Sequence, residues 1–436
     1  MKCSHYNKLL ISYKSIYACN LLTDAVLSFP KESESIIHLI LTYPNIDYEN
    51  DVVNEIKELL YANGFLIHDD FDELKNLKER YFISQSKRNT FCIQIANTLR
   101  CNFRCTYCYE LHESIDLCKI KQNSLIQFVE RNIHKWNKLC ISWFGGEPLL
   151  RPDIIEYISE RLITICDEQS VYYEGFITTN GYLLNQDNAK LLKLCRVREA
   201  QITIDGDKTT HDQRRFLING KGTYDVIINN IFEVANHINT FRIRVNVDTQ
   251  VKLSLTDIID KLDPIRDKVW LGFMPVQKIH CNKNEIYSYE EYHNTISGLY
   301  NLAVNRGYRI APGYRLPGST YCGTYDENYF LVDARGDLHK CVVMTGKPEY
   351  RIGYLNDDGH VIYLINPLNK WDFDPFRDKD CLYCDCLPLC MGGCQNFSFE
   401  KKRESGRCIV KDNLDRNLIT IIESGQKDNI IGRAAY

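Results

Sequence analysis

The fold is decided by TFCIQIANTLRCNFRCTYCYE, residues 90–110, where an apolar run leads directly into three closely spaced cysteines. The run TFCIQIA has the length and apolar content of a buried β-strand. Cys101, Cys105 and Cys108 follow in a CxxxCxxC pattern. Three thiols are an unusual set, because a structural zinc ion normally takes four protein ligands and disulfides use cysteines in pairs. The segment therefore predicts a strand that ends in a metal-binding loop with one ligand missing.

An iron–sulfur cluster would explain why the loop has three thiols and not four. A [4Fe–4S] cluster has four irons and is usually held by four thiolates. Three protein thiolates leave one iron free to bind a small molecule. We therefore interpret the loop as the site of a [4Fe–4S] cluster with an open iron.

The composition excludes several classes of function. The chain has 436 residues, 44% of them hydrophobic and 25% charged, which is typical of a soluble protein of two or three domains. A formal net charge of −4 gives no reason to expect nucleic acid or an anionic membrane as a partner. The beginning, MKCSHYNKLLISYKS, has no apolar region of a signal peptide, and no apolar run reaches the roughly 18 residues of a membrane span. We expect a cytoplasmic protein.

Cysteine is the one unusual residue type, with 19 in the chain. A reducing cytoplasm disfavours disulfides, so metal or cluster ligation is the better interpretation for a set of this size. Cys92, Cys140, Cys166 and Cys195 lie in apolar stretches, and we expect these four to be small hydrophobic core residues.

Strand-like and helix-like segments alternate between residues 90 and 310. Six strands, each followed by a helical pattern, predict an α/β fold with a parallel sheet and right-handed crossovers. Six units are fewer than the eight that close a barrel, so we predict an open, partial (βα)6 barrel. The strands are expected at 90–96, 138–144, 172–179, 199–205, 241–248 and 269–276.

Glycine and polar residues follow the strands where each one ends. GGEP (145–148) follows the second strand, TNG (179–181) the third and DG (205–206) the fourth. Active sites of α/β barrels and open sheets lie at this carboxyl edge. Glycines allow a close backbone approach, and the Glu147 carboxylate can accept an ammonium group.

CNFRCTYCYE followed by GGEP resembles the radical S-adenosylmethionine (SAM) superfamily. The resemblance implies that the open iron chelates the amino and carboxylate groups of SAM. It also implies reductive cleavage of SAM to a 5′-deoxyadenosyl radical, which abstracts hydrogen from the substrate. The loop of Gly145, Gly146 and Glu147 is then expected to hold the methionine amine, with Tyr107 against the adenine. The resemblance further places Thr203 and Arg215 near the ribose and carboxylate of SAM, although the family more often has serine at position 203.

After residue 310 the regular periodicity fades and cysteines accumulate. Their order resembles the SPASM domain, which implies two auxiliary [4Fe–4S] clusters and a total of three in the chain. The resemblance assigns Cys322, Cys341 and Cys394 to the first auxiliary cluster, and Cys381, Cys384, Cys390 and Cys408 to the second. The first cluster has three thiolates, so we expect an open iron there, with Cys281 and Cys386 as alternative fourth ligands. A zinc ribbon is the other interpretation, but the paired CxxC units of such a ribbon are missing.

The first 85 residues have a different pattern. Short strands are expected at 8–14 and 25–30, amphipathic helices at 33–43 and 51–65, an extended stretch at 65–68 and a charged helix at 69–82. This order suits a small winged-helix domain like the recognition elements of peptide maturases, which take a leader peptide as an extra strand. A plain structural cap on the barrel is the alternative. We thus divide the chain into a winged-helix domain (1–85), a radical SAM partial barrel (86–310) and a SPASM domain (311–436).

The resemblance implies an oxidoreductase that modifies a ribosomally made precursor peptide, for example by a crosslink or thioether. Its partners would be the precursor with its leader and an electron donor such as flavodoxin or ferredoxin. An anaerobic sulfatase-maturing enzyme that forms formylglycine is an alternative, but that group commonly has aspartate after the second SPASM cysteine, where this chain has Val342. A non-catalytic iron–sulfur or zinc scaffold that binds a peptide is a third interpretation. No residue is identified as the catalytic proton acceptor.

Overall fold

The computed structural model describes residues 1–86, 89–248, 255–276, 289–310, 322–365, 374–393 and 414–423. They form two compact units. The first unit contains residues 1–86, 322, 374–393 and 414–423, and the second contains 89–248, 255–276, 289–310 and 323–365. The described residues after 310 are therefore divided between the units. The three-domain division remains a prediction.

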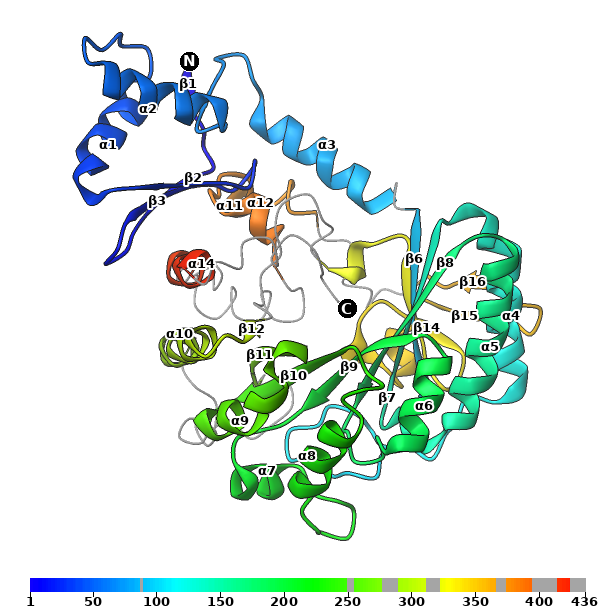
Figure 1. Ribbon diagram of the computed structural model, residues 1–436. Helices are drawn as coiled ribbons and strands as arrows, with labels where there is room; N and C mark the ends of the chain where they lie inside the picture. The colour runs from blue at the N-terminus through cyan, green and yellow to red at the C-terminus, as the bar shows by residue number, and fades with distance from the viewer. Residues whose placement is uncertain are drawn as a thin grey trace. The chain divides into compact units, whose positions relative to one another are not determined.

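The second unit is built on one 11-stranded sheet in the order β12-β11-β10-β9-β8-β7-β6-β13-β14-β15-β16 (Figure 1). In this order, all neighbouring strands between β12 and β13 pair in parallel, and the pairs β13–β14, β14–β15 and β15–β16 are antiparallel. The strands are β6 (Thr90–Thr98), β7 (Lys138–Gly145), β8 (Tyr172–Thr179), β9 (Val197–Thr203), β10 (Thr240–Val247), β11 (Val269–Pro275), β12 (Arg309–Ile310), β13 (Tyr329–Val332), β14 (Asp337–His339), β15 (Gly353–Leu355) and β16 (Val361–Tyr363). The predicted α/β fold with a parallel sheet is confirmed.

The strands β6 to β11 are the six that the sequence predicts. Two parallel neighbours were missed, since β12 and β13 are only two and four residues long. β13 lies beside β6, and an antiparallel meander follows it, so part of the cysteine-rich region extends the barrel sheet.

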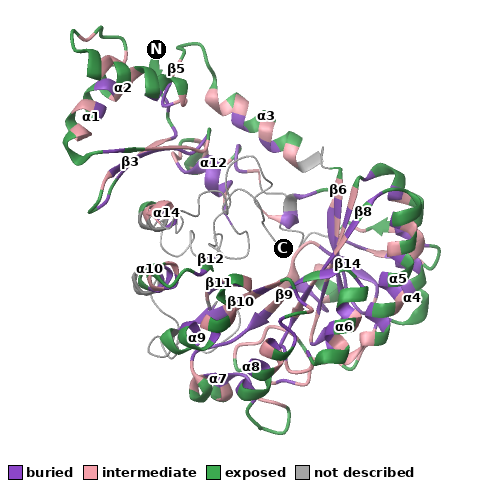
Figure 2. Ribbon diagram, in the orientation of Figure 1, coloured by how far each residue is buried: buried purple, intermediate pink, exposed green. Residues whose placement is uncertain are grey.

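Helices follow the strands of the sheet in the expected alternation. They are α4 (Lys119–Asn132), α5 (Pro152–Glu168), α6 (Gln186–Leu194), α7 (Lys208–Arg214), α8 (Tyr224–Glu233), α9 (Leu255–Leu262) and α10 (Tyr289–Asn305). The Asn185 side chain caps α6, and the Asp207 side chain caps α7. Figure 2 shows that the strands are mostly buried and that the helices are exposed on their outer faces. None of the described helices has the length and apolar character needed to cross a bilayer.

An aromatic cluster joins the strands to the helix layer. The Phe91 ring of β6 stacks on Trp136 at 4.3 Å between ring centroids, and Phe330 of β13 lies 5.2 Å from Phe128 of α4. All four rings are buried. The alternation of side chains along β6 therefore directs Phe91 to the helices and Cys92 to the opposite face of the sheet.

The first unit begins with a three-stranded antiparallel sheet, β2 (Asn7–Ile11), β3 (Ile16–Asn20) and β4 (Ala25–Phe29). Helices α1 (Glu34–Thr42), α2 (Asp51–Ala62) and α3 (Glu73–Ser86) follow, and β1 (Lys2–Cys3) pairs with β5 (Leu66–Ile67). The sequence predicts these elements except β1, which is two residues long, and β3. β3 is buried on both faces and has no alternation of apolar and polar residues.

The sheet of the first unit separates two hydrophobic cores. One face packs against α1 and α2 through Ile16, Ile37 and Leu60. The other face packs against the C-terminal segment, which contributes α11 (Lys379–Leu382), α12 (Leu387–Cys390) and α14 (Leu414–Glu423). The two ends of the described chain thus share one core.

Truncating Phe330 tests the packing of β13 against the barrel. Phe330→Ala leaves a cavity between Phe91 and Phe128, and we expect a loss of about 3–5 kcal/mol in the free energy of unfolding of this unit. Leu194→Ala is the matched control, because Leu194 is 76% exposed and its loss should cost no more than about 0.5 kcal/mol. Thermal unfolding of both variants measures the difference, and equal stability would contradict the packing role.

Candidate active site

The loop with the three cysteines is held by hydrogen bonds to the segment after α7. Arg104 N donates to Phe216 O at 2.9 Å, and Thr106 N donates to Arg214 O at 3.0 Å. Phe103 forms an isolated bridge with Leu217. The residues between the cysteines are therefore positioned by the end of α7 and the segment that follows it.

The three thiols of this loop are partly exposed, and the charges of Cys105 and Cys108 act on Cys101. Burial, with a smaller contribution from the neighbouring Cys105, raises the pKa of Cys108 to about 12. Burial also raises the pKa of Cys101, with Glu147, Cys105 and Cys108 adding to the shift. Three thiolates at this site need a cation to offset their mutual repulsion. The donor set fits an iron–sulfur cluster, since iron binds thiolates and the loop supplies three of them.

The GGEP turn is joined to the start of the cysteine loop by backbone contacts. Gly146 N donates to Thr98 O at 3.1 Å, and Glu147 N donates to Arg100 O at 2.8 Å. A Cβ on Gly146 would overlap with the carbonyl oxygen of Arg100, and a Cβ on Gly145 would overlap with that of Thr98. Gly145 also has a φ of +118°. Both glycines are required because the chain itself passes there, directly before Cys101.

Glu147 is completely buried, and its carboxylate accepts three hydrogen bonds from neutral donors. They come from Thr179 Oγ1 at 2.7 Å, Asn180 N at 2.7 Å and Leu149 N at 3.0 Å. No ion pair of Glu147 exists among the described residues, and burial raises its pKa. The side chain thereby ties the end of β7 to the end of β8. Its predicted contact with the amine of SAM remains a prediction.

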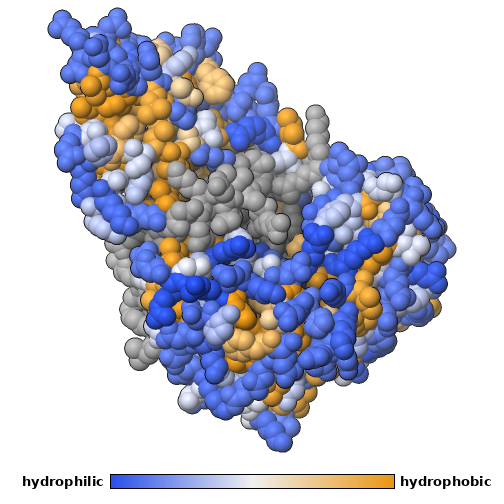
Figure 3. All heavy atoms as spheres, viewed as in Figure 1, coloured by the Kyte–Doolittle hydropathy of each residue, from blue (hydrophilic) through white to orange (hydrophobic). Residues whose placement is uncertain are grey.

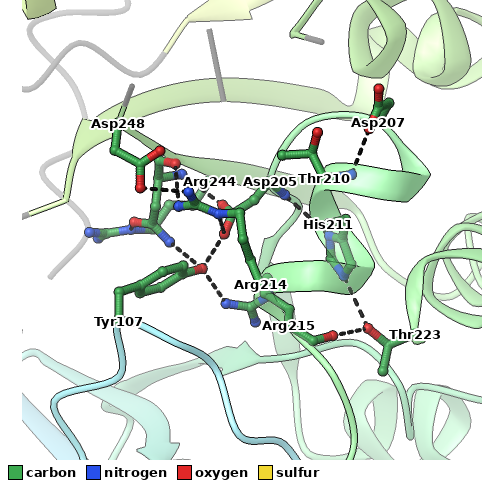
Figure 4. Close-up of polar contacts among 11 residues, drawn as sticks. Tyr107, Asp205, Asp207, Thr210, His211, Arg214, Arg215, Thr223, Arg244 and Asp248 are labelled. Atoms are coloured by element: carbon green, nitrogen blue, oxygen red, sulfur yellow. Dashed lines mark hydrogen bonds and ion pairs between the residues drawn. The ribbon is translucent and has the colours of Figure 1, made fainter. Parts of the chain in front are cut away.

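The Tyr107 hydroxyl connects the cysteine loop to three other elements (Figure 4). It donates to the Asp205 carboxylate after β9. It accepts from Arg215 Nη1 at 2.8 Å and from Asn246 Nδ2 of β10 at 3.0 Å. Asn246 N in turn donates to Asp205 Oδ1 at 2.9 Å. The residue before Cys108 is thus held at the carboxyl edge of the sheet.

A buried ion-pair network surrounds Tyr107 and was missed by the sequence analysis. Arg214 Nη1 lies 2.5 Å from Asp248 Oδ2, Arg214 Nε lies 3.5 Å from Asp205 Oδ2, and Arg214 is only 2% exposed. His211 Nδ1 accepts from Asp205 N at 3.2 Å, and burial together with the two arginines lowers the pKa of His211 well below its ordinary value. The histidine is therefore neutral. The sequence placed Asp205 and Asp248 at strand ends, but nothing in it indicated that Arg214 joins them.

The other predicted site residues lie at the same edge of the sheet. Thr203 is the last residue of β9, and Arg215 follows α7; both are buried. The Arg215 guanidinium also lies over the Phe103 ring at 5.8 Å. The structure therefore brings Tyr107, Gly145, Gly146, Glu147, Thr203 and Arg215 to the strand ends around the three thiols.

The C-terminal cysteines are described in part. In the first unit, Cys381 and Cys384 are partly exposed, and Cys390 ends α12. The ligand atoms of Cys384, Asp385 and Cys386 all lie within 4.8 Å of one another, so Cys386 is beside a predicted cluster ligand. Cys322 and Cys341 belong to different units. Cys281, Cys394 and Cys408 lie outside the described residues, and both auxiliary clusters remain predictions.

Comparison with known proteins identifies the class. Residues 97–260 match the family model of the Radical SAM superfamily, which covers the cysteine loop, GGEP and the Tyr107 network. Residues 97–260 therefore form a radical SAM domain, and the superfamily expected from the motifs is confirmed.

Two relatives match over most of their length. The chain is 26% identical to the cysteine-type anaerobic sulfatase-maturating enzyme of Clostridium novyi (strain NT), over 68% of this chain and 85% of the relative. It is 22% identical to the radical SAM cyclopropyl synthase TigE of Paramaledivibacter caminithermalis, over 90% of this chain and 88% of that protein.

Solved structures show the same fold. Native anSMEcpe with bound AdoMet and Cp18Cys peptide has a TM-score of 0.61 at 19% identity, covering 78% of this chain and 99% of that chain. Streptococcus suis SuiB bound to the precursor peptide SuiA has a TM-score of 0.50 at 14% identity, covering 91% and 96%.

Adding one methyl group to the GGEP turn tests whether it positions the cysteine loop. We expect Gly146→Ala to displace residues 98–100 and prevent assembly of the cluster on the loop, which removes about one third of the iron if three clusters are present. Gly298→Ala is the control, because Gly298 is exposed on α10 and a Cβ there meets no atom within 4 Å. Iron analysis after anaerobic reconstitution measures both variants. Full iron content in Gly146→Ala would contradict the role of the turn.

Proposed function

We propose that this radical SAM enzyme is a SPASM-type maturase that modifies a ribosomally made precursor peptide. The observation that carries the proposal is the convergence of a three-thiol loop, the GGEP turn and the Tyr107 network at one edge of the sheet. The substrate class is supported by two fold neighbours that are bound to peptides, Cp18Cys and the precursor SuiA, and by a relative named as a sulfatase-maturating enzyme. The radical SAM match argues against a non-catalytic scaffold.

Cys101, Cys105 and Cys108 would hold the first [4Fe–4S] cluster, and Gly145, Gly146, Glu147, Thr203 and Arg215 would surround SAM. When bound, these groups supply reductive cleavage of SAM to a 5′-deoxyadenosyl radical. The chain itself orients the loop through Tyr107 and provides cationic groups at Arg214 and Arg215. An electron donor such as flavodoxin or ferredoxin would reduce the enzyme. Three clusters in all, two of them in the SPASM region, complete the proposed cofactor set.

The first unit offers a free sheet edge for the leader of the precursor. On the β2 side, Leu10 shares a core with Leu414, and Lys8 pairs with Asp385 at 2.7 Å. On the other side, no described strand pairs with the outer edge of β4. An extended leader would therefore add as a strand to β4, with affinity from main-chain hydrogen bonds.

The hydrogen-bond alternation of the sheet identifies which groups of β4 face outward. Leu21 N donates to Tyr6 O on the β2 side, so Ala18 directs its backbone to β4. Ala18 is paired with Leu27, and the backbone of the next residue, Ser28, then points away from β3. Ser28 is exposed.

Apolar side chains near this sheet suit a peptide with hydrophobic residues. Figure 3 shows them gathered on the first unit over α1 and the sheet. The exposed large hydrophobic residues on and around α1 and α2 are Leu39, Tyr43, Ile46, Val52, Leu59 and Tyr61.

Formylglycine formation in a sulfatase is the second candidate function, favoured by the 26% identity to the Clostridium novyi enzyme. Activity on a peptide that contains the sulfatase cysteine motif, compared with activity on a precursor peptide encoded beside the gene, distinguishes the two functions. Conversion of the sulfatase peptide alone would overturn the maturase proposal.

Removing the three thiols tests the reaction. Cys101→Ala/Cys105→Ala/Cys108→Ala should abolish formation of 5′-deoxyadenosine from SAM under reducing, anaerobic conditions. Its iron content should fall from about twelve to about eight per chain, since one cluster of three is lost. The control is Cys166→Ala, which changes a buried thiol of α5 outside the site. SAM cleavage by the triple variant would refute the assignment.

Blocking the edge of β4 tests leader recognition. Ser28→Pro removes one outward N–H group, and we expect about ten-fold weaker binding of the leader, or about 1.4 kcal/mol. Ser28→Ala keeps the N–H group and should bind normally. Calorimetric titration of the full-length protein with a synthetic leader measures both. SAM cleavage without peptide should be unchanged. Equal affinity in the two variants, with equal melting temperatures, would leave the first unit as a structural cap.

A further inference from the structure

His112 has an unusual backbone conformation close to the cysteine loop. Its φ is +51°, a left-handed conformation that side chains other than glycine adopt at a cost. Ser170 and Arg196 have similar values, but each lies just after the end of a helix, where this conformation is common. His112 follows no helix. Such strain persists only where the surrounding structure enforces it.

The chain on either side of His112 is fixed by independent contacts. On one side, Cys108 N donates to Cys105 O at 3.2 Å within the cysteine loop. On the other, Glu113 forms an ion pair with Arg335, and Leu99 N donates to Ile115 O at 2.9 Å. His112 therefore bridges the loop and a segment that is attached to β6.

The strained backbone places the imidazole against a cluster thiol. His112 Nε2 lies 3.3 Å from Cys108 Sγ, and the ring is partly buried. A thiolate only accepts hydrogen bonds, so a metal-bound Cys108 requires the tautomer with a proton on Nε2. Cys101 Sγ, in comparison, accepts from a backbone group, Phe103 N at 3.4 Å. The bond to Cys108 is the one that a side-chain substitution can remove.

We propose that His112 donates a hydrogen bond from Nε2 to the metal-bound Cys108 thiolate and raises the reduction potential of the cluster on this loop. The inference rests on the proposed function, which puts a [4Fe–4S] cluster on Cys101, Cys105 and Cys108. A donor near a cluster sulfur withdraws negative charge from it, so it stabilises the reduced, more negative state. His112 is a positioning and tuning residue, since it acts through Cys108.

Three variants separate the hydrogen bond from the packing of the ring. His112→Phe keeps an aromatic ring without a donor. His112→Gln carries an amide N–H group that can reach the same sulfur. His112→Gly relieves the left-handed backbone and has no side-chain donor. The measurement is a dithionite titration followed by electron paramagnetic resonance, on the signal that is missing from the Cys101/Cys105/Cys108 triple alanine variant.

We expect the midpoint potential to shift to more negative values in His112→Phe and His112→Gly, and to return most of the way in His112→Gln. An unchanged potential in His112→Phe with full iron content would overturn the proposal. So would the same shift in His112→Phe and His112→Gln, because it would show a packing effect. Absence of the proposed cluster from the loop is a distinct outcome, since the wild-type protein would then lack the signal itself.

A measurement on the wild-type protein covers the case in which the variants do not assemble a cluster. Protein labelled with 15N-histidine should show a weak nitrogen coupling in pulsed resonance spectra of the reduced cluster. No histidine coupling would overturn the proposal. A strong coupling, as from nitrogen bound directly to iron, would also overturn it.

Discussion

The site depends on a close approach of two backbones, in which the GGEP turn after β7 lies against residues 98–100 at the end of β6. Two backbone hydrogen bonds stabilise this approach, and it is possible because Gly145 and Gly146 have no Cβ atom. The residue after Arg100 is Cys101, so the turn determines where the cysteine loop begins. A side chain on either glycine would separate the two strand ends and displace the first thiol.

The rest of the cysteine loop is held by a network of buried charged side chains. Tyr107 joins it to Asp205 and Arg215, while Arg214 is shared between Asp205 and Asp248. Breaking one member of such a network leaves a buried charge without its partner, which is costly. The network therefore fixes the edge of β9 and β10 relative to the cysteines and leaves cationic groups beside the place where SAM is proposed to bind.

The first unit shows why a simple deletion of its N-terminal residues would be hard to interpret. Its sheet contacts α1 and α2 on one face and the C-terminal helices on the other. Cys386 is buried in the second of these cores and lies beside Cys384, a predicted cluster ligand. Removing the N-terminal sheet would thus expose the core under a proposed auxiliary cluster site. Substitutions on the outer edge of β4 avoid this problem.

The class of fold and the superfamily could be predicted from the amino-acid sequence alone. The six strands were predicted because buried parallel strands are continuous apolar runs, and the motifs at their ends predicted the radical SAM family, which the family match confirms. The strands β1, β12 and β13 were missed because they have too few residues to show a period. β3 was missed because it is buried on both faces and has no alternation of apolar and polar residues. Arg214 and His112 were also missed, because Arg214 gains its role from partners that are distant along the chain and His112 from a backbone angle. The cysteines and the GGEP motif can be recognised from the sequence because their residues are close together along the chain. The ion pairs of Arg214 and the contact of His112 with Cys108 Sγ depend on tertiary packing, because they join residues whose positions are set by where strands and loops end in space.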